Sequence, residues 1–465
     1  MKKISLSIWG ILLSLQLFAT SSSIGTLNVI YGDNFAGNFP AVKRYELITD
    51  KGIIKLNASD KFIQSMPLNS WHGRNVKVIF KEPVDKFYTD RVIQSITLVG
   101  VKTNFTSKAL TGSQPWVSIL CKFSDINAEP QNLAYFQGLY SNNAGGMDHY
   151  WRETSYNDIN TLGSTAVDWV NLPSPQTTYI PIPGSAADAD LDLLFDDCTS
   201  AADAFVNYAD AGNGFPYVGI NMMFNDLLDC CAWGGGHWAN LDGASKAWRV
   251  TWEPPWGYAN AAVIAHEMGH GFGLPHSNNS DGDTSPYDSP WGVMSAATSS
   301  SVLDATYGAR GKHITMAFKY DLGWVTDSDG FIATDNTNQT ITVDRTSKDT
   351  INNFRFAKIN LSNGTYYMVE ARKKVGEYDA NLPGEAIIIN HVNNNRSEPP
   401  WIVDEDNPPA TFSNNEGVMW KVGETFFDTI DGYSIEVFAS TNEGFEIIIK
   451  GPNLSNDLIF SNSFE

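Results

Sequence analysis

The segment 259–272 constrains the fold of this chain more than any other part of the sequence. It reads Ala-Asn-Ala-Ala-Val-Ile-Ala-His-Glu-Met-Gly-His-Gly-Phe, an apolar run without proline that predicts an α-helix. Because His266 and His270 are four residues apart, their imidazoles lie on one face of that helix, about 5–6 Å apart at Cβ. Two imidazoles at this distance can bind one metal ion, so a further ligand is expected near this helix.

A third histidine follows the helix closely. Gly273 allows the positive φ that ends a helix, so the chain can turn and bring His276 to the same ion. Three neutral imidazoles suit zinc and leave one position for a water, whose pKa falls to about 7 on the metal. Glu267 can reach that water without binding the metal, and we expect it to act as general base. Histidines that merely line a helix are disfavoured, because every fixed position of His-Glu-x-x-His-x-x-Gly-x-x-His is present.

The residues His266 to His276 resemble the zinc signature of the metzincin peptidases. Val293-Met294-Ser295 is similar to their Met-turn, which places Met294 beneath the metal. Over about residues 110–450 the chain is similar to secreted peptidases of the gametolysin and immune inhibitor A kind, most clearly in short segments. These segments are 150–156, 274–277, 320–324 and 382–384. The resemblance implies a metzincin-like zincin catalytic domain with one zinc ion, which hydrolyses peptide bonds in extracellular proteins or peptides.

The residue two positions after Met294 departs from the metzincin pattern. Many metzincins have a tyrosine there that binds the metal or stabilises the oxyanion, whereas this chain has Ala296. Another group is then needed to stabilise the oxyanion. The candidates are Tyr287, Tyr307 and His313, and a structural role in a loop or in the core is the alternative for each.

Region 24–108 is a candidate pro-domain without a familiar inhibitory group. In several zinc peptidases a thiol of the pro-segment caps the metal, but this region contains no cysteine. A cysteine switch from this region is therefore excluded. The segment from Asp33 to Asn38 has some similarity to an acidic pro-segment switch, but its composition favours a surface turn.

The length and the changes of pattern predict a multidomain α+β protein. A chain of 465 residues exceeds what one hydrophobic core holds. Short alternating runs over 24–108 predict a small N-terminal β domain. Strands alternating with helices predict the catalytic domain over 109–326. Beyond it, short strands with turn residues predict a C-terminal all-β sandwich over 327–452, followed by a tail at 453–465.

Single elements can be placed in the predicted catalytic domain. Buried strands are expected at 116–120 and 218–224, and helices at 130–140 and 187–211. The aspartates around Asp190 suit the positive end of the second helix dipole. These elements would surround the helix that carries the histidines.

The first residues predict a signal peptide over 1–23. Lys2 and Lys3 precede an apolar run over 4–18, and small residues follow at 19–23. An uncleaved membrane anchor is disfavoured, because the run is shorter than the roughly 20 residues that a spanning helix needs. The mature protein is therefore expected to be secreted, with no stable membrane anchor after signal removal.

The charge balance argues against polyanionic partners. The formal net charge is -21, and no run of Lys and Arg in the sequence is longer than three residues. A chain without a basic surface does not neutralise phosphates, so nucleic acid and anionic membranes are not expected as partners. We expect a monomer that meets extracellular protein or peptide substrates.

Four cysteines in an exported chain predict disulfide bonds. Cys230 and Cys231 are neighbours and are not expected to pair with each other. Bridges from them to Cys121 and Cys198 would connect the parts of one domain. No Cys/His spacing suits a structural zinc site.

Two weaker signals lie near the histidine motif. Asp281-Gly282-Asp283, with Asp288 nearby, is a candidate Ca²⁺ loop, although solvated carboxylates are the favoured interpretation. Gly234-Gly235-Gly236-His237-Trp238 suits either a cleft wall beside an edge strand that pairs with an extended substrate, or a tight glycine turn. His237 itself is not expected to bind the metal.

The sequence therefore supports three functional hypotheses. The first is a secreted zinc-dependent endopeptidase with a metal-activated water and Glu267 as general base. The second is a catalytically silent peptidase-fold adhesin or binding protein, which the presence of Glu267 disfavours. The third is a zinc hydrolase that acts on substrates other than peptides.

Overall fold

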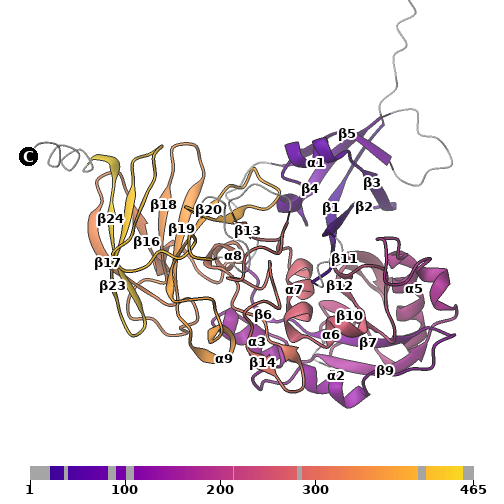
Figure 1. Ribbon diagram of the computed structural model, residues 1–465. Coiled ribbons are helices and arrows are strands. Elements are labelled where there is room, and N and C mark those ends of the chain that lie inside the picture. The colour runs from indigo at the N-terminus through magenta and orange to yellow at the C-terminus, as the bar shows by residue number, and fades with distance from the viewer. Residues whose placement is uncertain are drawn as a thin grey trace, which may run out of the picture.

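The computed structural model describes residues 21–35, 40–81, 91–100, 109–212, 214–279, 285–406 and 415–453. The chain is a mixed α/β protein, rich in β-sheet, and Figure 1 shows it divided into three parts. We call them the N-terminal part (21–100), the central part (109–326) and the C-terminal part (327–453). The expected tail after 453 and residues 1–20 of the expected signal peptide lie outside the described residues.

Five strands form the sheet of the central part, in the order β11-β12-β10-β7-β9. β7, β9, β10 and β12 run parallel, and β11 runs antiparallel to β12. Parallel strands are buried on both faces, which is why β7 and β10 read as the continuous apolar runs that predicted them. The bounds are β7 Trp116–Lys122, β9 Thr165–Asn171, β10 Gly219–Phe224, β11 Ala232–Leu241 and β12 Ala244–Glu253.

Helices cover both faces of this sheet. On one face α5 (Leu191–Ala202) packs in an apolar cluster that includes Met222. On the other face α7 (Ala261–Gly271) packs in a second cluster that includes Met223. Because neighbouring residues of a strand point to opposite faces, the two methionines separate the two clusters. The helix that carries the histidine motif is therefore a core element, and every residue of α7 is buried.

The helix expected at 187–211 is shorter than predicted. It begins after Asp190, whose side chain accepts a hydrogen bond from the backbone N–H of Leu193, and ends at Ala202. A 3-10 turn over Asp203–Phe205 follows, and the chain then extends and buries Tyr208. Tyr208 contacts Trp248 edge to face, and its N–H donates to Asp242. A tertiary contact thus ends the helix earlier than its apolar spacing predicted.

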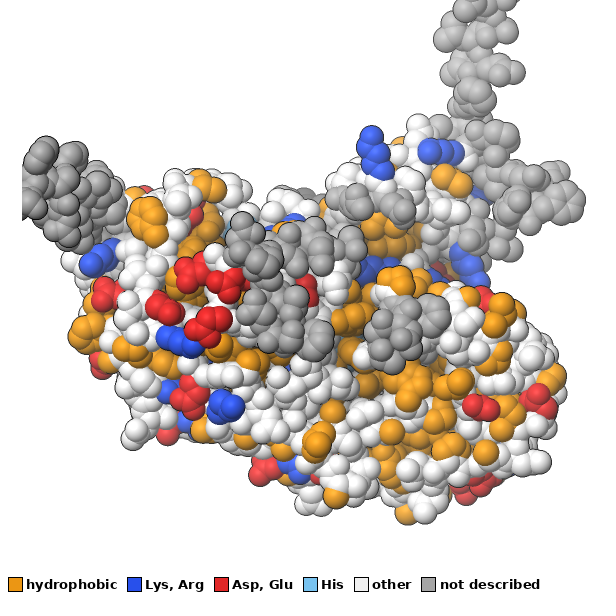
Figure 2. All heavy atoms as spheres, viewed as in Figure 1, with side chains coloured by type: hydrophobic (Ala, Val, Ile, Leu, Met, Phe, Trp, Pro, Cys, Tyr) orange, Lys and Arg blue, Asp and Glu red, His pale blue; other side chains and the backbone are white. Residues whose placement is uncertain are grey.

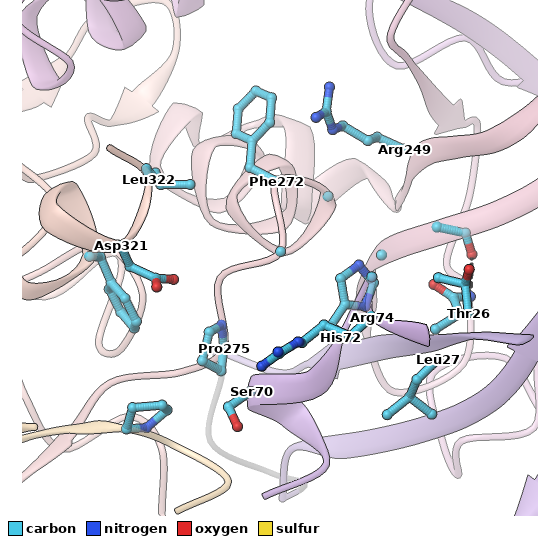
Figure 3. A pocket seen from close by; sticks show the side chains of 18 of the residues that line it. Thr26, Leu27, Ser70, His72, Arg74, Arg249, Phe272, Pro275, Asp321 and Leu322 are labelled. Carbon is cyan, nitrogen blue, oxygen red and sulfur yellow. Dashed lines mark hydrogen bonds between the residues drawn. The ribbon is translucent and has the colours of Figure 1, made fainter. Parts of the chain in front are cut away.

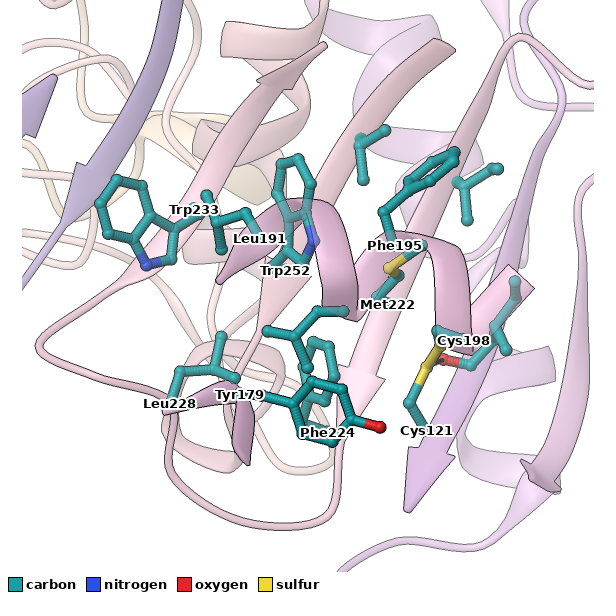
Figure 4. Close-up of a cluster of buried hydrophobic side chains, with 14 of the residues drawn as sticks. Cys121, Tyr179, Leu191, Phe195, Cys198, Met222, Phe224, Leu228, Trp233 and Trp252 are labelled. Atoms are coloured by element: carbon teal, nitrogen blue, oxygen red, sulfur yellow. Dashed lines mark hydrogen bonds between the residues drawn. A yellow bond between two sulfur atoms is a disulfide. The ribbon is translucent and has the colours of Figure 1, made fainter. Parts of the chain in front are cut away.

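The predicted pairing of the cysteines is wrong. Cys121 of β7 pairs with Cys198 of α5, and Cys230 pairs with its neighbour Cys231. Figure 4 shows the first bridge inside the apolar cluster beneath α5. Cys121 faces α5 because of the alternation along β7, with a Cα–Cα distance of 5.9 Å to Cys198, so neither sulfur is left for the other pair.

The N-terminal part is a small closed sheet. Its strands follow the order β2-β3-β5-β4-β1, and β1 also pairs with β2. Alternating apolar residues fill the inside with a core that includes Leu27, Leu47 and Val78. The bounds are β1 Ser22–Asp33, β2 Val42–Thr49, β3 Gly52–Asn57, β4 Asn75–Phe80 and β5 Arg91–Leu98, with the helix α1 at Asp60–Ser65.

β1 belongs to two parts of the molecule. Its first residues pair with β4, where Ser22 lies opposite Ile79, and its last three pair antiparallel with β11, where Asp33 lies opposite Ala232. The N-terminal and central strands therefore form one ten-stranded sheet. Since β1 begins at Ser22, the expected signal peptide over 1–23 would include the first two residues of this strand.

The C-terminal part is built from two sheets that share one apolar core. One sheet has the order β13-β21-β20-β19-β18-β16, and the other has the order β17-β24-β23-β22. The strand β13 (Asn278–Asn279) comes from the central part and pairs with β21. The other bounds are β16 Gly330–Ala333, β17 Asn338–Asp344, β18 Phe356–Asn360, β19 Tyr366–Arg372, β20 Ala386–Val392, β21 Pro400–Ile402, β22 Thr425–Phe427, β23 Ser434–Ser440 and β24 Gly444–Lys450.

Short elements complete the described part of the chain. One of them, α2, lies inside the helix expected at 130–140. Their bounds are α2 Leu133–Leu139, α3 Met147–Thr154, α4 Gln176–Tyr179, α6 Pro255–Tyr258, α8 Met316–Asp321, α9 Gly376–Asp379, β6 Gly112–Ser113, β8 Ile159–Asn160, β14 Leu303–Asp304 and β15 Gly308–Ala309.

The surface follows the acidic composition of the chain. On the face shown in Figure 2, Lys and Arg side chains lie scattered and form no continuous patch. A scattered basic charge does not bind a polyanion strongly. Within the described ranges, each helix is too short or too polar to cross a lipid bilayer.

Candidate metal centre

The three motif histidines converge in the interior of the protein. His266, His270 and His276 are each fully buried. The Nε2 atoms of His266 and His270 lie 2.9 Å apart, and the ring of His276 is centred 4.8 Å from that of His270. The turn that brings His276 back requires Gly273, whose φ is +94°. The local spacing thus places the imidazoles as the sequence predicted.

Backbone carbonyls fix the orientation of two of these rings. Nδ1 of His266 lies 2.7 Å from the carbonyl oxygen of Val293, and Nδ1 of His270 lies 2.7 Å from that of Leu274. A carbonyl only accepts, so each Nδ1 carries the hydrogen and each Nε2 presents a lone pair to the centre. Two lone pairs at 2.9 Å repel each other unless a cation lies between them. The donor set therefore fits a metal ion.

Met294 lies directly against the helix of the motif. A Cβ atom at Gly269 would overlap the sulfur of Met294, so the glycine makes room for this methionine beside His270. The carbonyl of Met294 accepts the N–H of Ser277, just after the third histidine. The loop at Met294 thus supports the floor of the site.

A fourth group completes the centre, and it comes from the N-terminal part. Oδ2 of Asp33 lies 3.1 Å from Nε2 of His270 and 3.3 Å from that of His266, and Oδ1 lies 2.9 Å from Nε2 of His276. The prediction of a surface turn at Asp33 is wrong, because this residue ends β1 and is fully buried. The ligand atoms of the four residues lie within 4.8 Å of one another, as a metal site requires.

Aromatic side chains enclose the centre. The ring of Tyr31 stacks on His270 at 3.9 Å, and Phe35 meets His266 edge to face at 4.9 Å. The hydroxyl of Tyr287 donates to Oδ1 of Asp33 at 2.5 Å. Burial alone would raise the pKa of Asp33, but His276 and His266 outweigh it and hold that pKa well below its usual range. Asp33 is therefore an ionised carboxylate.

Burial also sets the protonation of His270 and Glu267. Burial, with some help from the neighbouring imidazoles, lowers the pKa of His270 to about 3, so this ring is neutral as a ligand must be. Burial, followed by Asp33 and Glu253, raises the pKa of Glu267 well above its usual range. Among the described residues neither oxygen of Glu267 has a hydrogen-bond partner. With Asp33 in place, the expected base is therefore protonated.

The C-terminal part also reaches the centre, which the sequence did not indicate. Oε1 of Glu398 lies 3.7 Å from Nδ1 of His276 and 2.5 Å from Nζ of Lys43. Burial opposes the charge of Glu398, but Lys43 and His276 outweigh it and lower its pKa to about 2. Glu398 belongs to no local motif, so only the fold reveals it. The segment at Asp33 had a sequence signal, an acidic pro-segment switch, but a surface turn was the favoured interpretation.

The other residues that the sequence singled out lie in different surroundings. Of the three oxyanion candidates only Tyr287 contacts the centre. Tyr307 packs on Tyr135, and His313 lies 3.2 Å from both Glu153 and Lys319. The candidate Ca²⁺ residues 281–283 lie outside the described residues.

The glycine-rich segment is neither a turn nor a metal site. Residues 234–236 lie within β11, and the pairing with β1 ends at Gly234. His237 lies 3.4 Å from Asp192, away from the other histidines. An added Cβ at Gly234 would lie 2.7 Å from Oε2 of Glu267, so glycine lets β11 approach α7 closely.

A separate cavity of 520 Å³ lies where the three parts meet. Figure 3 shows His72 and Arg74 of the N-terminal part on one side of the cavity, with Arg249 and Phe272 of the central part. Asp321 lies on the opposite side of the cavity. The four residues of the metal centre do not line it. The metal centre is thus a closed site, distinct from this cavity.

No protein-family model matches the chain, and neither a curated protein nor a solved structure matches it significantly. The chemistry of the centre therefore has to be argued from its geometry. That geometry is a buried set of three imidazoles and a carboxylate, with a second carboxyl group on the same helix.

Proposed function

We propose that the chain is a secreted, zinc-dependent endopeptidase of the metzincin type. The observation that carries the proposal is the convergence of three Nε2 atoms on one buried point, with Glu267 beside them on α7. Three imidazole ligands leave the fourth coordination position of a zinc ion open to water or substrate. This ligand set is typical of catalytic zinc sites, whereas structural zinc sites have four protein ligands. A zinc ion held there would act as a Lewis acid that polarises a peptide carbonyl and makes water a stronger nucleophile.

The side chains have separate roles in this proposal. His266, His270 and His276 hold the metal, and the carbonyls of Val293 and Leu274 keep two of the rings oriented. Glu267 accepts a proton from the attacking water and returns it to the leaving amine. Glu267 has to be ionised to accept this proton. The negative charge of Asp33 is one cause of the raised pKa of Glu267, so the departure of Asp33 would favour the ionised form.

The edge of β11 that β1 covers supports a peptide substrate. β1 lies antiparallel along β11, with Tyr31 opposite Gly234 and Asp33 opposite Ala232. An extended peptide that replaced β1 would form the same backbone hydrogen bonds and pass across the metal. A hydrolase for small esters does not need such a strand edge. A pure binding protein does not need Glu267, whose burial without a hydrogen bond costs stability.

Metal dependence tests the proposal. The intact chain, and the chain after limited trypsin digestion of the N-terminal part, are assayed for casein cleavage, and zinc content is measured alongside. We expect cleavage by the digested form, its loss with a chelator and its return with zinc. An ester panel is the control for substrate class. Zinc-bound, digested protein that cleaves no casein would rule out the endopeptidase, and ester turnover alone would favour another hydrolase.

Tyr287 is the residue best placed to stabilise the oxyanion. Its hydroxyl now donates to the oxygen of Asp33 that lies nearest His276. We expect Tyr287→Phe to lower kcat by roughly 10²- to 10³-fold with little change in KM, since the lost donor acts mainly on the transition state. Tyr307→Phe, whose ring packs on Tyr135, is the matched control. A change confined to KM would mean that Tyr287 binds substrate instead.

A further inference from the structure

We propose that the cavity between the three parts binds a small carboxylate with an apolar body, and that Arg249 is the ion partner of this carboxylate. The four residues of the metal centre do not line the cavity, and the inference does not depend on the proposed function. The volume of 520 Å³ lies within the range of about 300–1,000 Å³ that is usual for small-molecule sites.

Arg249 carries a charge that no neighbouring carboxylate balances. Its guanidinium donates to Oε1 of Gln114 at 3.1 Å and lies over the ring of Phe272, 5.0 Å from the ring centre. Burial lowers the pKa of Arg249 to about 10, and no acidic side chain of the described residues pairs with it. A buried cation without an anion costs stability, and the guanidinium has further N–H donors to offer. A bound carboxylate would supply the missing partner.

The positive charge around Arg249 exceeds the negative charge. Burial, together with the charge of Arg249, lowers the pKa of Lys246 to about 8, which shows a second cation close to the guanidinium. Arg74 and Asp321 face each other across the cavity (Figure 3). Burial raises the pKa of Asp321, and the charge of Arg74 opposes this rise, so these two charges offset each other. The remaining positive charge attracts an anion, although the chain as a whole carries -21.

His72 adds a neutral donor to the same wall. The backbone N–H of Val29 donates to Nδ1 of His72 at 2.9 Å, so the ring hydrogen is on Nε2. Burial, with a smaller contribution from the charge of Arg249, lowers the pKa of His72 to about 4, and the ring stays neutral near pH 7. A guanidinium and a neutral imidazole N–H both donate. A carboxylate, which only accepts, therefore matches this wall.

The rest of the lining favours an apolar body for the ligand. Its apolar side chains come from all three parts and include Leu27, Phe272, Pro275, Phe318, Leu322 and Val392. Inorganic phosphate would lose water on this surface without gaining a partner for its second charge. A monocarboxylate places its one charge at Arg249 and its hydrocarbon body on the apolar surface. A fatty acid and an apolar peptide with a free carboxyl end share this chemistry.

Calorimetric titration of the intact chain tests the inference. The probes are octanoate, N-acetyl-leucyl-leucine, inorganic phosphate and octanol, which keeps the chain of octanoate but lacks its charge. We expect octanoate to bind one-to-one and roughly 10- to 100-fold more tightly than octanol, because the alcohol lacks the charged hydrogen bond. The tighter of the two carboxylates identifies the source of the ligand. Octanol as tight as octanoate, phosphate tighter than octanoate, or no binding of either carboxylate would overturn the inference.

An arginine variant locates the ligand. Arg249→Gln should weaken octanoate binding by the same roughly 10- to 100-fold and leave octanol binding unchanged, which loss of a merely structural residue would not do. The matched control is Arg91→Gln, since Arg91 also lies over an aromatic ring, 4.9 Å from the centre of Phe80, but does not line the cavity. A folded Arg249→Gln protein that binds octanoate like the wild type would contradict the assignment.

The wild-type chain keeps the inference testable if the variant does not fold. The comparison of octanoate with octanol needs no variant. Removal of zinc by a chelator should leave octanoate binding unchanged, because the metal centre and the cavity share no residue. Loss of octanoate binding together with the metal would place the carboxylate at the metal centre and overturn the inference.

Discussion

Glu267→Gln is expected to lower kcat/KM for casein by roughly 10²- to 10⁴-fold, while the zinc content stays that of the wild type. Glutamine fills the same volume, which matters because Oε2 of Glu267 lies close to Gly234 of β11. It cannot accept the proton of the attacking water, and this step accounts for the expected range. Because Glu267 is not one of the four grouped ligands, the metal should remain. Cleavage and zinc content of the trypsin-digested protein check both halves of the prediction.

A second buried carboxyl group offers the matched control. Glu253 ends β12, is fully buried, and burial raises its pKa to about 8, so it is mostly neutral near pH 7. Glu253→Gln therefore replaces one neutral group by another and should change cleavage by less than about 10-fold. Equal losses in the two variants would show that Glu267 has a structural role and not the role of a base.

Arg372→Met is expected to destabilise the protein by about 3–5 kcal/mol and to weaken zinc retention. Arg372 of β19 is fully buried and donates two hydrogen bonds to Asp379 and one, of 2.6 Å, to the carbonyl of Trp291. Methionine leaves the buried carboxylate of Asp379 without its guanidinium partner. It also releases the loop that runs from Trp291 to Met294, whose Val293 carbonyl orients His266. Denaturant unfolding and zinc loss to a competing chelator measure the two effects.

An exposed ion pair is the control for this variant. Lys421 pairs with Glu416, and both side chains are largely exposed, so Lys421→Met should cost less than about 1 kcal/mol. Adding Asp379→Asn to Arg372→Met should recover part of the lost stability, since the carboxylate that lost its two hydrogen bonds from the guanidinium is then neutral. If Arg372→Met changes stability but leaves zinc retention as in the wild type, the C-terminal part does not support the metal centre.

Local spacing explains what the sequence could predict of the site. The helix period fixes His266 and His270, and one glycine turn brings back His276, so all three follow from eleven consecutive positions. Asp33 is 233 residues before His266, and only the pairing of β1 with β11 brings it there. A single aspartate after an apolar strand looks like the start of a turn, which is why a surface turn was the better sequence-based interpretation.

In the fold, too, the elements that depend on local sequence patterns could be predicted, and those that depend on contacts between distant residues could not. Apolar runs predicted β7 and β10 because burial on both faces leaves a local pattern. The early end of α5 depends on the burial of Tyr208 against Trp248, which no helical pattern reports. The N-terminal part was expected as a separate β domain, yet it continues the central sheet, because a strand of twelve residues is long enough to join two sheets.

The shared strand β1 has a consequence for solubility. While β1 is present, the backbone of β11 at Trp233 and Gly234 is paired with a strand on each side. Once β1 leaves, one side presents bare N–H and C=O groups to water, which is a template for pairing with any extended chain, including another copy of the same protein. The net charge of -21 opposes such contacts by repulsion. Salt that screens this charge would therefore promote aggregation of a form that has lost β1 more than aggregation of the intact chain.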